Sequence, residues 1–149
     1  MRPSEIRERV LAEHERLRAD FERIEAIARA AHDGALERFG DLRVEADALL
    51  ARLLSHMRWE ESYLLPTLRN SDSWGAERAA RLIKDHRDQR ELFRFLHSRL
   101  ASTEPWPVMA QRLSDLIALL RDDIAEEERD LLDERVLRDD VVAIDALSG

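Results

Sequence analysis

Six polar side chains in this sequence stand on stripes that would face the core of a helical protein. They are His14, His56, Glu60, His86, Asp123 and Glu127. Such stripes are normally filled by Leu, Ile, Val, Phe and Ala, because burying an isolated charge or an unpaired imidazole is unfavourable. Imidazole nitrogens and carboxylate oxygens are also the donors that bind iron, manganese and zinc. The residue types therefore indicate a metal site.

The spacing of four of these residues supports that interpretation. His56 and Glu60 are four positions apart, and so are Asp123 and Glu127. Residues at i and i+4 lie on one face of a helix, so each pair can converge on a single point. In both pairs the second member begins a Glu-Glu that is followed two residues later by Leu-Leu. This repetition predicts an internal repeat of helix pairs, with His14 and His86 as matching single ligands.

Two other interpretations of the cluster start from the same residues. A lone histidine on an apolar face is more often a hydrogen-bonded core residue than a ligand. Arg90, one turn after His86, could instead neutralise the acids in a structural salt-bridge network, leaving a helical interaction or regulatory module with a degenerate site. If Asp123 faces away, the three histidines and one or two carboxylates would form a mononuclear iron or zinc site.

Four helices are expected to position these side chains. The chain has only four glycines and four prolines, and between them apolar residues recur at intervals of three and four. Ser4 is a candidate N-cap, and Pro66 is expected to kink or end the last turn of the second helix. No pattern with period 2 indicates a strand. We predict an all-α, up-down-up-down four-helix bundle, with helices over residues 4–31, 41–68, from the polar turn at 70–73 to 101, and 106–138.

The depth of the six residues along such a bundle places them in one layer. At about 1.5 Å per residue, His14 and His86 lie roughly 15 and 18 Å from the starts of their helices. The second and fourth helices run the opposite way, and their polar pairs lie roughly 12–20 Å from the adjoining ends. All six side chains can therefore face one another.

Length and composition limit the other possibilities. The chain has 149 residues, of which 44% are hydrophobic, which suits one folded domain. We expect this domain over residues 1–140 and a short tail over 141–149. The net charge is −8, which argues against nucleic-acid or anionic-membrane partners. No stretch approaches the ~20 apolar residues of a membrane span, so a cytoplasmic protein is expected.

The absence of cysteine has its own consequence. It excludes disulfides, iron–sulfur clusters, thiolate zinc sites and a cysteine nucleophile. The sequence also has no Gly-rich phosphate loop and no Ser/His/Asp arrangement for acyl transfer. Any metal must be held by His, Asp and Glu.

Nearly the whole chain resembles the hemerythrin-like, HHE cation-binding family. The most specific feature is His-x-x-x-Glu-Glu-x-x-Leu-Leu-Pro over residues 56–66, accompanied by single histidines in the first and third helices and a related element in the fourth. The resemblance implies a four-helix bundle with a non-haem di-iron centre. By that resemblance Glu60 and Glu127 would bridge the ions, and His14, His56 and His86 would be terminal ligands.

Two departures from the family pattern shape the expected function. Asp123 stands where the family has its second paired histidine, and Arg90 stands where oxygen carriers have another histidine. The first departure weakens one metal position. The second argues against reversible oxygen transport and toward iron-centre repair, nitric-oxide response, or iron and oxygen sensing. We therefore expect non-haem iron, with manganese or zinc as alternatives, and a diatomic ligand such as oxygen or nitric oxide, or peroxide.

Overall fold

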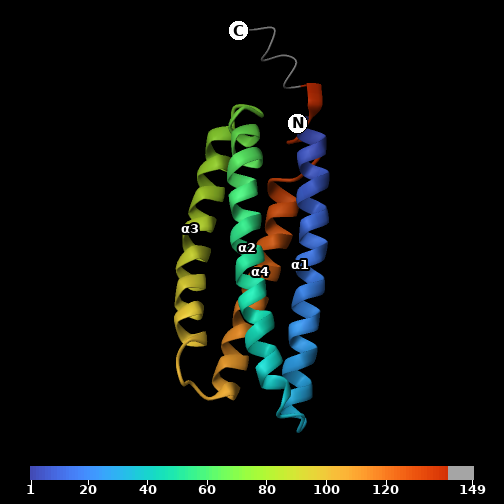
Figure 1. Cartoon of the computed structure of the whole chain (residues 1–149). Coiled ribbons are helices and arrows are strands. Elements are labelled where there is room, and N and C mark those ends of the chain that lie inside the picture. The colour runs from blue at the N-terminus through green and yellow to red at the C-terminus, as the bar shows by residue number, and fades with distance from the viewer. Residues whose placement is uncertain (141–149) are drawn as a thin grey trace.

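The computed structural model describes residues 1–140, and the predicted tail at 141–149 lies outside them. The described part forms an up-down-up-down bundle of four helices, which confirms the predicted fold class (Figure 1). They are α1 (Pro3–His32), α2 (Arg38–Arg69), α3 (Gly75–Leu100) and α4 (Trp106–Asp130). α1 packs on α2, α2 packs on α3, and α4 contacts both α1 and α3. Within this part of the chain, no helix combines the length and apolar character needed to cross a membrane.

Local chemistry sets the ends of α1. Pro3 occupies its first turn, where a missing N–H costs nothing. The backbone N–H of Arg2 donates to the Glu5 carboxylate at 2.8 Å. The prediction of Ser4 as N-cap is wrong, because Ser4 lies inside the helix and its hydroxyl donates to Asp139 at 2.8 Å. After the helix, Gly34 adopts a φ of 115°, a backbone conformation that favours glycine.

The predicted end of the second helix at residue 68 is close to the structure, in which α2 continues past Pro66 to Arg69. The predicted end of the fourth helix is wrong, because α4 stops at Asp130 rather than at residue 138. Beyond this end the Asp133 carboxylate accepts the backbone N–H of Arg135 at 2.8 Å, which stabilises a local turn. The turn lets four apolar side chains that follow α4 become buried over the end of the bundle. They are Leu131, Leu132, Val136 and Leu137.

The core consists of two separate apolar clusters. One fills the half of the bundle that holds the α1–α2 and α3–α4 turns, and includes Leu17, Met57, Phe93 and Ile124. The other fills the half near the N-terminus, and includes Val10, Leu64, Leu82 and Leu131. On each helix the predicted polar position falls between a residue of the first cluster and one of the second. The bundle therefore carries a polar layer sealed by hydrophobic side chains on both sides.

The tight turn before α3 generates a stability prediction. A Cβ added to Gly75 would lie 2.3 Å from the carbonyl oxygen of Leu68 and 2.6 Å from that of Arg69. These are backbone atoms, so Gly75→Ala must displace the turn, and we expect it to destabilise the fold by about 1–3 kcal/mol. Gly40→Ala, whose Cβ would meet nothing within 4 Å, should be neutral or stabilising by at most about 1 kcal/mol. Urea unfolding of the two variants measures the difference, and equal midpoints would contradict this account of the turn.

Candidate metal centre

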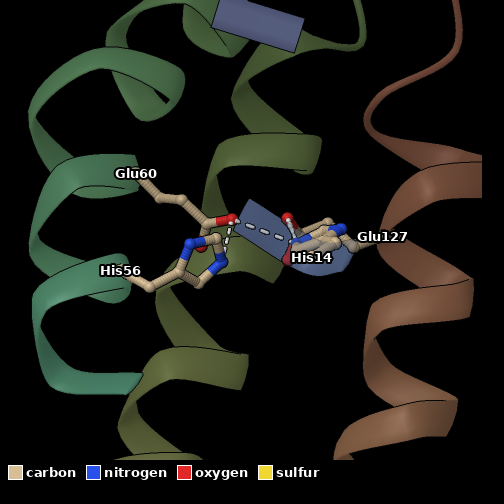
Figure 2. A group of neighbouring side chains, drawn as sticks. All are labelled: His14, His56, Glu60 and Glu127. Carbon is tan, nitrogen blue, oxygen red and sulfur yellow. Dashed lines mark ion pairs between the residues drawn. The ribbon is translucent and has the colours of Figure 1, made fainter. Parts of the chain in front are cut away.

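Five of the six predicted site residues meet in the polar layer. His14 comes from α1, His56 and Glu60 from α2, His86 from α3 and Glu127 from α4. His14, Glu60 and His86 are buried, with 0%, 1% and 2% of their surface exposed. One potential ligand atom from each of His14, His56, Glu60 and Glu127 lies within 4.8 Å of all the others, and their side chains point toward one another (Figure 2).

The Glu60 carboxylate lies at the centre of this arrangement. Its Oε1 is 2.9 Å from His56 Nε2 and 3.8 Å from His14 Nε2. Its Oε2 faces the other way and is 2.9 Å from His86 Nε2. Glu127 approaches from the opposite helix, with its Oε1 3.3 Å from His14 Nε2. The two oxygens of Glu60 thus face different histidines: Oε1 faces His56 and His14, and Oε2 faces His86.

Three buried atoms of the cluster lie in ion-pair contacts but form no well-aligned hydrogen bond. They are His14 Nε2, Glu60 Oε1 and Glu127 Oε1. Buried polar atoms in folded proteins are nearly always hydrogen-bonded, so three atoms without a hydrogen bond at one point require an explanation. Imidazole nitrogens and carboxylate oxygens turned toward a common point fit a divalent transition metal, because the ion satisfies them all. The residues present therefore fit a bound cation.

Protons compensate the buried charge in the metal-free cluster. Burial alone would lower the pKa of His14, but the Glu127 and Glu60 carboxylates raise it to about 9. Burial also opposes protonation of His56, and the charge of Glu60 raises its pKa to about 10. Burial and the neighbouring Glu60 raise the pKa of Glu127 to about 8. Near neutral pH the cluster therefore holds protons that a bound cation would replace.

Glu60 behaves differently from Glu127. Burial acts to raise the pKa of Glu60, but the positive charge of His56 and hydrogen bonding hold it well below the ordinary value of 4.5. Burial and the repulsion between the two carboxylates favour a retained proton on Glu127, whereas the adjacent His56 charge keeps Glu60 ionised. The pKa of Glu60 is therefore lowered while that of Glu127 is raised.

Asp123, the sixth predicted ligand, is not brought into this group. Its carboxylate accepts a hydrogen bond from Gln89 Nε2 at 3.0 Å. Gln89 lies three positions after His86, and Asp123 lies four positions before Glu127, so this pair sits about one helical turn from the polar layer. Burial raises the pKa of Asp123, while the bond from Gln89 opposes the shift.

Sequence reasoning missed a second set of acids around the histidines. His14 Nδ1 lies 3.2 Å from Glu128, His56 Nδ1 lies 2.6 Å from Glu13, and His86 Nδ1 lies 2.9 Å from Glu61. The signal that could have found them is their position, since each is adjacent in the sequence to a predicted ligand. Arg90 also proves to contact Glu61, at 2.7 Å. Its charge therefore serves an outer acid, and the described contacts give it none with Glu60 or Glu127.

A small cavity adjoins the cluster on the α1–α2 side. It has a volume of about 170 Å³ and is lined by Glu13, Arg16, Leu17, Asp20, Arg52, Ser55 and His56. His56 is 10% exposed at its side chain, more than His14 or His86. A larger cavity of about 420 Å³ lies between α1 and α4 beside Trp106, and none of the cluster residues line it. Of these two cavities, the smaller one therefore lies beside the cluster.

Comparison with known proteins agrees with the geometry. Residues 5–134 match the family described as the hemerythrin HHE cation binding domain. The match spans all four helices and all five residues of the cluster. No curated protein and no solved structure matches the chain.

The raised pKa values predict how the stability of the metal-free protein depends on pH. The pKa values of His14 and His56 exceed the ordinary value of 6.5, so their contribution is complete below pH 6.5 and is lost as the pH rises to about 9 and 10. Glu127 acts in the same direction between 4.5 and about 8. As the pH rises from 6.5 to about 9, we expect the free energy of unfolding of the metal-free protein to fall. The fall should exceed about 1.4 kcal/mol, the equivalent of one pKa unit.

Urea unfolding of chelator-treated protein at a series of pH values measures this fall. Saturating divalent metal should remove the trend, because the cation replaces the protons. A metal-free protein whose stability is constant or rises over the same range would show that the cluster does not hold these protons.

Proposed function

Because the chain belongs to the hemerythrin HHE cation-binding domain family, we propose that its buried cluster binds non-haem iron. The observation that supports this most strongly is the convergence of three buried atoms that form no hydrogen bond, His14 Nε2, Glu60 Oε1 and Glu127 Oε1. Three imidazoles and two carboxylates offer the mixed nitrogen and oxygen donors that suit iron, with manganese and zinc as competitors. The bound iron would interact with oxygen, nitric oxide or peroxide, or would serve in handling or sensing iron.

The donors favour two unequal metal positions. The first would be held by His14, His56, Glu127 and one oxygen of Glu60, the atoms that already lie within 4.8 Å of one another. The second would be held by His86 and the other oxygen of Glu60, which are 2.9 Å apart. Glu60 would then bridge the two ions, as carboxylates do in di-iron bundles. With Asp123 bound to Gln89, the second position has fewer protein donors, and we expect it to bind its ion more weakly.

The protein's part in the chemistry follows from its own residues. Bound iron would supply open coordination positions for a diatomic ligand and a metal that can change its oxidation state. The Glu60 and Glu127 carboxylates would balance the charge of the ion, and the histidines would present neutral nitrogens to it. The apolar side chains on both sides of the layer exclude bulk water. The cavity beside His56 provides the approach for a small ligand.

A mononuclear site is the second candidate, and the Gln89–Asp123 contact favours it. If the second position never fills, one ion would be held by the four-donor group alone. The two candidates differ in metal stoichiometry. Elemental analysis of protein purified from iron-supplemented cells, with its near-ultraviolet absorption in air, separates them: two irons per chain with oxo-bridge charge-transfer bands support the di-iron centre, and one ion supports the mononuclear site.

Substitutions test which residues hold the metal. Glu60→Gln preserves size and removes the central charge, so we expect iron affinity to fall by at least about 100-fold, beyond the loss typical of residues outside the ligand set. Asp123→Asn should leave the first ion in place. Asp122→Asn, an exposed neighbour on α4, controls for the change in net charge. Metal content after dialysis against a weak chelator provides the measurement.

Unchanged iron content in Glu60→Gln would contradict the assignment of the site. Absence of metal from the unmodified protein under all loading conditions would favour the helical interaction module, in which protons alone neutralise the layer. Loss of half the iron in Asp123→Asn but not in Asp122→Asn would make Asp123 a ligand of the second ion, despite its contact with Gln89.

A further inference from the structure

The three histidines of the cluster share one orientation. In each ring Nε2 faces the polar layer, and Nδ1 faces a glutamate on a neighbouring helix. The pairs are His14 of α1 with Glu128 of α4, His56 of α2 with Glu13 of α1, and His86 of α3 with Glu61 of α2. The contacts run in one direction around the bundle, from α4 to α1, from α1 to α2, and from α2 to α3.

Each glutamate is itself held by an arginine. Arg18 contacts Glu128 through two nitrogens, at 2.9 and 2.8 Å. Arg90 lies 2.7 Å from Glu61, and Arg9 lies 3.4 Å from Glu13. Side chains that are paired in this way lose much of their freedom to move. The rings are therefore fixed by acids that are fixed in turn from the protein surface.

Helix geometry explains why these acids are available. Each one is the chain neighbour of a cluster residue: Glu13 precedes His14, Glu61 follows Glu60, and Glu128 follows Glu127. Successive residues of an α-helix are rotated by about 100°, so the neighbour of an inward-facing residue points along the flank toward the next helix. One turn of helix thereby supplies a donor to the cluster and a partner for the histidine of the adjacent helix.

The charge state of the glutamates decides which nitrogen carries hydrogen. Arg90, Arg18 and Arg9 each place a positive charge beside one of these carboxylates, which favours its ionised form. Ionised carboxylates only accept hydrogen bonds. Each Nδ1 must then carry the hydrogen, and in the neutral ring Nε2 keeps its lone pair for a cation.

We propose that Glu13, Glu61 and Glu128 are positioning residues that fix all three histidines as Nε2 donors to the metal. This inference rests on the proposed function, because the histidines must bind an ion for their orientation to matter. A carboxylate behind a ligating imidazole both selects its tautomer and makes the ring a stronger donor. The three acids therefore determine the affinity of a site whose ion they do not touch.

The test uses Co²⁺ as the probe with Glu13→Gln, Glu61→Gln and Glu128→Gln. An amide keeps the size of the carboxylate but loses the charge that holds the Nδ1 hydrogen, so each variant should bind Co²⁺ about 10–100-fold more weakly. The matched control is Glu126→Gln, an exposed acid on α4 that pairs with Arg81 at 3.2 Å. It removes the same charge without contacting a histidine, and its affinity should match that of the unmodified protein.

Proton NMR of the Co²⁺-loaded chain provides a readout that a general loss of stability would not produce. Imidazole Nδ1–H groups beside the paramagnetic ion give shifted resonances that disappear on exchange with deuterium. We expect one such resonance for each of the three histidine–glutamate contacts, provided both metal positions are filled. Each variant should broaden or lose its own resonance, and Glu126→Gln should keep all of them.

The outcomes separate this inference from the proposed function. If the unmodified chain binds no Co²⁺, both fail. If it binds Co²⁺ and the three variants keep both their affinity and every exchangeable resonance, the metal site stands and the positioning role is overturned. Because the three contacts are separate, a variant that does not fold leaves the other two as full tests.

Discussion

The burial of two carboxylates in the middle of the bundle constrains every side chain packed around them. Glu60 and Glu127 reach the same point from α2 and α4, where ionising both without compensation would be strongly unfavourable. In the metal-free chain three histidines and a retained proton provide that compensation, which the raised pKa values of His14, His56 and Glu127 express. A transition-metal ion would replace these protons and bind the buried atoms that form no hydrogen bond.

The rest of the bundle maintains that constraint. Apolar clusters on both sides of the layer keep it out of bulk water, as the burial of Leu17 and Val10 around His14 illustrates. A small cavity adjoins the layer beside His56. The outer glutamates contact the buried histidines on one side and arginines nearer the surface on the other. Ion pairs therefore connect the buried site to the charged surface of the helices.

Helical periodicity predicted the bundle and the polar layer because both depend on which face of a helix a residue occupies. His14, His56, Glu60, His86 and Glu127 interrupt apolar stripes at matching depths, and the structure brings them together. The same reasoning could not place Asp123, since its contact with Gln89 depends on the relative rotation of α3 and α4. It also extended α4 too far, because the apolar residues after Asp130 leave the helix and are buried by tertiary packing, as Leu131 and Leu132 are. The outer acids were visible as sequence neighbours, but their partners lie on other helices.

Metal binding is expected to exchange protons for a cation, so the number of protons released can be measured for each ion bound. Calorimetric titration of the metal-free chain with Fe²⁺ under anaerobic conditions at pH 7, repeated in buffers of different ionisation enthalpy, gives the number of protons released per ion bound. The pKa values of about 9, 10 and 8 for His14, His56 and Glu127 mean that these groups hold protons at that pH. We predict release of more than one proton with the first ion. Binding with no proton release, or no binding at all, would contradict the account.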